Sequence, residues 1–171
     1  MLGDRARERI EATTSSSFAC DLRRWLQIME AYEGGGHAYH ATPPTDGLLK
    51  LRDVMFEARA RGLEKLRAEQ LELGRQVRAL LAREGFESVA APGFEAASVI
   101  VSYSDDPGVI DGSKFAARGL QIAGGVPLQC DEGSDFRTFR VGLFGLDKLQ
   151  DVARTVRYLE DALSGIVRSR G

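Results

Sequence analysis

Residues 136–144 read FRTFRVGLF, and the alternation within them decides the fold. Phe139, Val141 and Leu143 recur at every second position, and Arg140 stands between the first two. Because successive side chains of a β-strand point to opposite faces, this pattern predicts a strand with one apolar face and one polar face. Helices are expected to cover the apolar face.

Shorter strands are expected before this one along the chain. Residues 97–103 are rich in β-branched side chains and give a strong signal, whereas the signal at residues 87–90 is weak. Residues 120–123 predict a short strand that ends at two glycines. Residues 105–108 (DDPG) predict a turn or loop.

Apolar side chains at three- and four-residue steps predict helices elsewhere. Leu22, Trp25, Leu26 and Met29 form one such face, and Ser17 is a fair N-cap for it. The expected helices are 6–12, 18–32, 45 or 46 to a break at Gly62, 63–85, 111 or 113 to 118, and a last helix that Asp147 caps and that reaches 167. Gly74 is expected to mark a close crossing with another element. This order of elements predicts an α+β domain with a small, largely antiparallel sheet and helices on one face.

Composition excludes several classes of protein. The chain has 171 residues, of which 43% are apolar and 28% charged, as in an ordinary soluble globular protein of one domain or one domain with an appendage. A net charge of -2 argues against a nucleic-acid partner, and the sequence contains neither a membrane span nor a signal peptide. Cys20 and Cys130 are far apart and suggest reduced thiols of a cytoplasmic protein. His37 and His40 have no cysteine or carboxylate cluster beside them, so no metal site is expected.

Residues 39–44 (YHATPP) form a second distinctive stretch. Tyr39 and Thr42 place two hydroxyl groups within four positions, and the two prolines that follow restrict the backbone. A stiff loop with hydrogen-bond donors ahead of a helix is suited to holding an anion. The alternative is a surface loop whose hydroxyls only cap the next helix.

Two motifs, YHATPPTDGLL at 39–49 and FRVGLFGLDKLQDV at 139–152, resemble the C-terminal part of class V pyridoxal-phosphate (PLP) aminotransferases. That family includes alanine–glyoxylate, serine–glyoxylate and phosphonate-processing transaminases. The resemblance covers nearly the whole chain and implies the small domain of the type I PLP-transferase fold. It makes residues 1–44 the end of the large cofactor domain. Residues 45–171 become the interdomain helix and the C-terminal small domain.

The resemblance also implies roles for individual residues. Tyr39 and Thr42 would donate hydrogen bonds to the PLP phosphate of the neighbouring subunit in a homodimer. Arg140 would bind the substrate carboxylate, a task that suits a planar guanidinium beside a glycine. Arg137 ranks second, since it lies outside the RxGLxG context, and a surface ion pair is the alternative for Arg140.

The chain departs from the family at one decisive point. A transaminase needs a lysine that forms a Schiff base with PLP, and Lys50, Lys65, Lys114 and Lys148 all lie in helical, solvated contexts that do not match it.

The expected function is therefore that of a transaminase fragment, inactive alone. The complete enzyme would move an amino group between an amino acid or aminophosphonate and a 2-oxo acid such as glyoxylate or pyruvate. The alternative is a non-catalytic dimerisation or carboxylate-binding module. Trp25 and Met29 are expected to be exposed, which predicts self-association.

Overall fold

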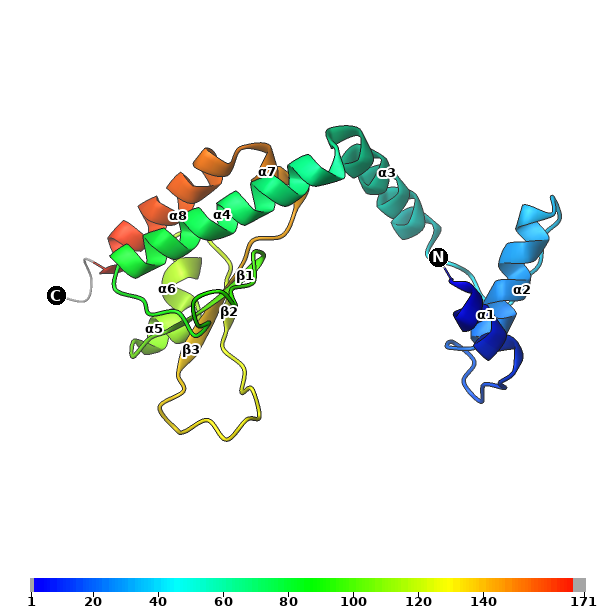
Figure 1. Ribbon diagram of the computed structural model, residues 1–171, viewed down its shortest axis with the longest axis horizontal. Helices are drawn as coiled ribbons and strands as arrows, with labels where there is room; N and C mark the ends of the chain where they lie inside the picture. Colours follow the sequence, from blue (N-terminus) through cyan, green and yellow to red (C-terminus); the bar gives the residue numbers. More distant parts are fainter. Residues whose placement is uncertain (1, 168–171) are drawn as a thin grey trace. The chain divides into compact units, whose positions relative to one another are not determined.

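The computed structural model describes residues 2–167, and its contacts divide the chain into two compact units, Met1–Asp53 and Val54–Gly171. The predicted boundary between residues 44 and 45 concerns the complete enzyme and stays a prediction. In chain order the elements are α1 (Asp4–Glu11), α2 (Leu22–Glu33), α3 (Thr45–Arg61), α4 (Leu63–Arg83), β1 (Val99–Tyr103), α5 (Pro107–Ile110), α6 (Ser113–Ala116), β2 (Ala123–Gly124), β3 (Thr138–Gly142), α7 (Leu146–Gln150) and α8 (Val152–Val167) (Figure 1).

The first unit contains α1 and α2. The predicted start of the second helix at residue 18 is wrong, because Ser17 accepts a hydrogen bond from the backbone N–H of Cys20 within a turn. Asp21 caps α2 instead and accepts from the N–H of Arg24 at 3.1 Å. The buried face differs from the prediction, since it contains Leu26 and Ile28 while Leu22 is exposed; Met29 is exposed, as expected for the isolated chain. Trp25 is half-buried, and its indole N–H donates to the carbonyl of Ala19.

α3 and α4 follow one another with a break at Gly62, as predicted. Gly62 has a φ of 89°, a backbone conformation that other residues rarely adopt. Gly74 in α4 confirms the expected close crossing, because a Cβ there would lie 2.6 Å from the carbonyl oxygen of Ala97. α4 therefore packs directly on the segment that leads into β1.

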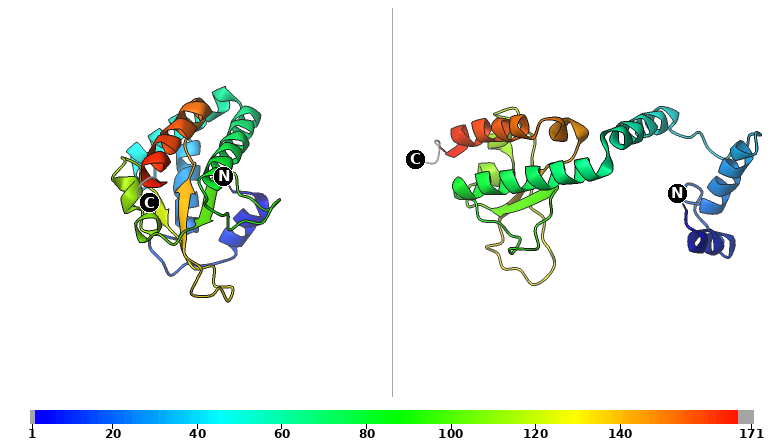
Figure 2. Two further views of the ribbon diagram at one scale, coloured as in Figure 1. Left: turned by 90° about the vertical axis from the view of Figure 1, so that its left-hand side faces the viewer. Right: turned by 45° about the horizontal axis from the view of Figure 1, so that its top comes forward.

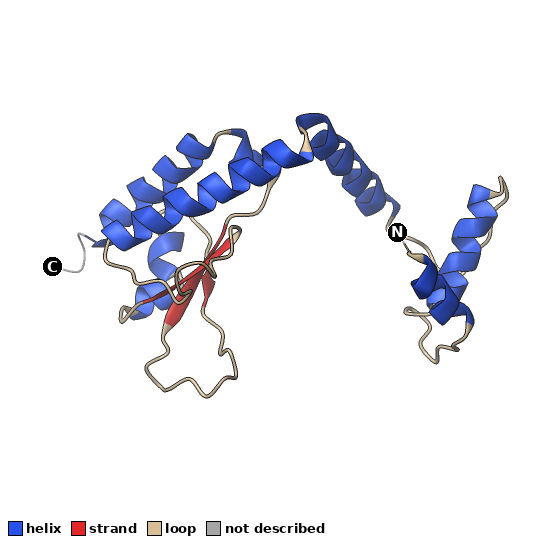
Figure 3. Cartoon of the chain, in the orientation of Figure 1, coloured by secondary structure: helices blue, strands red, loops and turns tan. Residues whose placement is uncertain are grey.

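The sheet belongs to the second unit and is antiparallel, with the order β1-β3-β2. β3 is its central strand, and Arg140 pairs with Val101 on one side and Ala123 on the other. Figure 3 shows these strands in red. The predicted strand at 87–90 is reduced to a single bridge between Ser88 and Ser102.

The other strands and the short helices deviate at their ends. The strand expected at 120–123 lies at Ala123–Gly124, and that expected at 136–144 is limited to Thr138–Gly142, because these are the positions that have partners to pair with. The expected turn at 105–108 becomes the start of α5, where Asp106 accepts from the N–H of Gly108 at 3.0 Å. The last helix is interrupted at Asp151, and α7 begins after Gly145, so Asp147 is not the cap.

The apolar face of β3 faces the core, as its alternation predicts. Phe139 and Val141 are buried, together with the neighbouring Leu143. The ring of Phe139 contacts those of Phe86 and Phe115, with centroids 5.1 and 5.8 Å apart. α4 and α8 lie side by side over this core (Figure 2). The fold is thus the α+β arrangement expected from the sequence.

Candidate functional site

Arg140 lies at the middle of the sheet, on the face opposite to the buried Phe139. It is half-buried, and its Nε–H donates to the carbonyl of Gly124 at 2.8 Å. Among residues 2–167, no carboxylate lies within ion-pair distance of this guanidinium. Its two terminal nitrogens are therefore available for an external anion.

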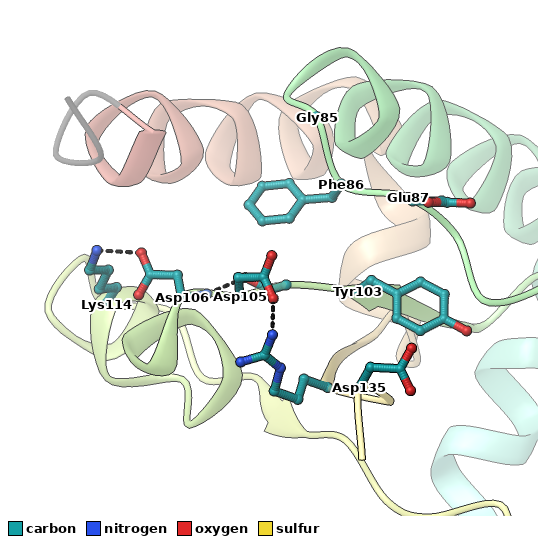
Figure 4. A pocket seen from close by; sticks show the side chains of 10 residues that line it. Gly85, Phe86, Glu87, Tyr103, Asp105, Asp106, Lys114 and Asp135 are labelled. Carbon is teal, nitrogen blue, oxygen red and sulfur yellow. Dashed lines mark hydrogen bonds and ion pairs between the residues drawn. The ribbon is translucent and has the colours of Figure 1, made fainter. Parts of the chain in front are cut away.

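Arg137, the second candidate, is engaged in a different way. Its guanidinium forms an exposed ion pair with Asp105, and both residues line a cavity of about 610 Å³. Figure 4 labels Asp105 in this cavity. In the same cavity Lys114 Nζ lies 2.5 Å from a carboxylate oxygen of Asp106. This hydrogen bond is the main cause that lowers the pKa of Asp106, and desolvation opposes it. Both cations of the cavity are thus already neutralised within the chain.

Sequence reasoning missed this cavity. The DDPG stretch was expected to form only a turn, and Lys114 was expected to be solvated. The structure shows instead that the side chain of Lys114 is 34% exposed and forms an ion pair with Asp106. Asp106 precedes α5 and Lys114 lies in α6, so the periodicity of a single helix or strand does not signal the pair.

The hydroxyls of Tyr39 and Thr42 meet at one point of the first unit. Tyr39 Oη lies 3.3 Å from Thr42 Oγ1, and Tyr39 is 77% exposed. Among the described residues, neither hydroxyl bonds to a backbone group of α3, so they do not cap that helix here. One of the two hydroxyls donates to the other in this arrangement, which leaves one O–H of the pair for an external acceptor.

His40 anchors this loop, a role that the sequence did not reveal. Its Nε2 lies 2.9 Å from the carbonyl oxygen of Phe18. The imidazole also packs on the rings of Phe18 and Trp25, with centroids 4.3 and 5.4 Å away. These contacts connect the loop that carries Tyr39 and Thr42 to Phe18 and to Trp25 of α2.

These observations define two partial sites. Tyr39 and Thr42 belong to the unit Met1–Asp53, while Arg140 belongs to the unit Val54–Gly171. A pair of hydroxyl groups suits part of a phosphate site, but it supplies no positive charge. Within residues 2–167, no cluster of His, Cys, Asp or Glu side chains could hold a metal ion. In the same range, no helix has the length and apolar character that crossing a bilayer requires.

Comparison with known proteins shows which solved structures share this fold. No protein-family model and no curated protein matches this sequence. Alanine–glyoxylate aminotransferase from Nostoc sp. is similar in structure, with a TM-score of 0.70 and 19% identity over 95% of this chain and 42% of that chain. A subgroup IV aspartate aminotransferase from Thermus thermophilus has a TM-score of 0.69 and 24% identity over 96% of this chain and 43% of that one.

At these identities the likeness concerns the fold. The chain has the fold of the C-terminal portion of aminotransferases and spans less than half the length of these two solved proteins. The α+β expectation is confirmed.

Proposed function

We propose that this chain forms part of a PLP-dependent aminotransferase of the class V type. The complete enzyme moves an amino group between an amino acid or aminophosphonate and a 2-oxo acid such as glyoxylate or pyruvate. The observation that carries this proposal is Arg140, whose terminal nitrogens are unpaired among the described residues. An arginine so placed within an aminotransferase fold is suited to bind a substrate carboxylate in a bidentate manner.

The proposed role of Arg140 is to bind and orient. A charge-assisted hydrogen-bonded pair holds the carboxylate in one plane, and this fixes the direction in which the rest of the substrate points. Tyr39 and Thr42 are proposed to donate to the PLP phosphate of the neighbouring subunit. When bound, PLP supplies an electron sink for the carbon that bears the amino group.

We further propose that the lysine which binds PLP comes from a different part of the enzyme. Lys114 is held by Asp106, and the side chain of Lys65 is 67% exposed on α4. Lys148 lies beside Asp147, and Lys50 is exposed on α3. Each of the four amines is thus exposed or ion-paired within the chain, whereas a lysine that forms a Schiff base needs a free amine that faces the cofactor. The chain alone is therefore proposed to be inactive.

The surface of α3 supports a larger assembly. No residue of this helix is buried, although it carries a series of large apolar side chains. Those that are exposed are Leu48, Leu49, Leu51, Val54, Met55 and Phe56. An apolar surface of this kind marks a protein–protein contact, which we assign to the rest of a homodimeric enzyme. Cys20 and Cys130 are free and exposed, in keeping with the cytoplasm as its compartment.

Carboxylate binding tests the proposal on the chain itself. An NMR titration with pyruvate or glyoxylate is expected to shift the side-chain signals of Arg140. Arg140→Ala should abolish the binding, and Arg137→Ala is the matched control that should retain it. No shift at Arg140 up to tens of millimolar ligand, or an equal loss in both variants, would refute the role of Arg140.

A cofactor experiment separates catalysis from mere binding. The chain is mixed with PLP, treated with borohydride and digested, and mass spectrometry is used to find modified lysines. We expect no stoichiometric modification of a single lysine. If one lysine were modified stoichiometrically and the sample transferred amino groups, the chain would be an enzyme in its own right.

A non-catalytic carboxylate-binding module is the second candidate, since Arg140 would serve it equally well. An in-frame coding region for a large cofactor domain ahead of this chain would favour the aminotransferase.

A further inference from the structure

We propose that two features of β2 and the residue after it position Arg140: the carbonyl of Gly124 and the absence of a side chain at Gly125. In this position the guanidinium binds a carboxylate end-on, through its two terminal nitrogens. The inference rests on the proposed function of Arg140 and specifies which edge of that side chain meets the substrate. Gly124 and Gly125 are positioning residues, since they act through Arg140.

The first step of the argument is the hydrogen-bonding capacity of the guanidinium. Arginine carries five N–H donors in one rigid plane. A carboxylate can be bound in two ways, either side-on by Nε and one terminal nitrogen or end-on by both terminal nitrogens. The single Nε–H of Arg140 already donates to Gly124 at 2.8 Å. The side-on mode would require this bond to break, so only the end-on mode is open.

The second step is the rigidity of the acceptor. Gly125 donates its N–H to the carbonyl of Thr138 at 2.8 Å, next to the register pair of Gly124 and Phe139. A Cβ at Gly125 would lie 2.6 Å from the Thr138 carbonyl oxygen and closer still to its hydroxyl. Thr138 is buried within the central strand, so it cannot move away from a Cβ added at Gly125. Only glycine allows this approach.

The opposite side of β2 is also occupied. A Cβ at Gly124 would lie 3.2 Å from the carbonyl oxygen of Ile110, at the end of α5. The Gly124 backbone is therefore confined between α5 and β3, and the direction of its carbonyl is set by both. A fixed acceptor restricts the rotation of the Arg140 guanidinium, which lowers the entropy lost when a carboxylate binds.

NMR of the arginine side chains tests the arrangement on the unmodified chain of 171 residues. Without ligand, the Nε–H of Arg140 is expected to exchange with solvent at least about tenfold more slowly than that of the exposed Arg157. When pyruvate is added, the terminal-nitrogen signals of Arg140 should shift while its Nε–H stays protected. Exchange as fast as at Arg157, or loss of protection on ligand binding, would overturn the inference.

Gly125→Ala is the matching variant, and Gly142→Ala is its control. A Cβ at Gly142 meets only the ring of Phe144 at 3.4 Å, an ordinary contact. Gly125→Ala should remove the Nε–H protection and weaken pyruvate binding roughly tenfold, while Gly142→Ala should retain both. A folded Gly125→Ala chain that kept the protection would also overturn the inference.

The two proposals fail in different ways. The Nε–H of Arg140 could be protected although Arg140 does not respond to pyruvate. That result would refute the carboxylate site and the end-on binding mode, but it would still support the positioning of Arg140 by Gly124. If Gly125→Ala does not fold, the measurement on the unmodified chain decides alone.

Discussion

Phe139→Ala is expected to remove much of the stability of the second unit. Phe139 is 0% exposed on the central strand, and it contacts the rings of Phe86 and Phe115. Truncation of a fully buried phenylalanine costs about 3–5 kcal/mol, since it removes apolar burial and leaves a cavity. Both aromatic contacts are lost with the ring, so we expect about 4 kcal/mol. A single domain has a free energy of unfolding of about 5–15 kcal/mol, so the loss is a large share of it.

The assay is urea denaturation followed by far-UV circular dichroism. Tryptophan fluorescence is unsuitable, because Trp25, the single tryptophan of the chain, lies in the other unit. With an m-value of about 2 kcal/mol/M, the midpoint should fall by about 2 M. Phe144→Ala is the control, because Phe144 is 60% exposed and its truncation should change the free energy of unfolding by less than about 0.5 kcal/mol.

A fall of less than about 0.5 M for Phe139→Ala would refute the reasoning. So would equal effects of the two truncations. Either result would mean that the face of β3 that carries Phe139 does not pack into the core of the unit. Arg140 would then not lie on the face of the sheet opposite to the core.

Three further predictions concern the loops, the surface and the cofactor. The pKa of Glu132 is lowered to about 2, first by the hydrogen bond from the backbone N–H of Cys130 and then by those from the N–H groups of Glu132 itself, Gln129 and Leu128, while desolvation opposes them. Since the pKa is depressed, the stabilisation of this loop is present above the usual pKa of 4.5 and is lost as the pH falls through about 2, and hydrogen exchange at Cys130 should show that Glu132→Gln removes this pH dependence. Leu51→Glu with Met55→Glu should reduce self-association in sedimentation velocity, whereas Arg59→Glu should not, because the first pair alone removes exposed apolar surface from α3; equal effects would point to charge as the cause. In the complete enzyme, Tyr39→Phe with Thr42→Ala should weaken PLP binding, by about 1.5–3 kcal/mol for each hydroxyl and less than additively. Mixed dimers with a subunit that lacks the PLP-binding lysine should recover part of the activity, and no recovery under proven subunit exchange would exclude a role across the dimer interface.

The candidate site was only partly readable from sequence. Arg140 could be placed on the polar face of a strand because alternation is a local property. Its hydrogen bond to Gly124 could not be predicted, since the partners are 16 residues apart and meet only when β2 pairs with β3. The same holds for His40 and Phe18, which are 22 residues apart.

The sequence by itself determined the class of the fold, the order of its main elements and the apolar face of β3. These follow from periodicities within a few residues, which the chain carries before it folds. Tertiary structure alone decided where each strand ends, that residues 87–90 form one bridge, and that the last helix divides at Asp151. Strand ends depend on which distant residues supply hydrogen-bond partners, and a helix divides where capping and packing outweigh propensity. Distance along the chain thus separates what the sequence determined from what only the folded structure could decide.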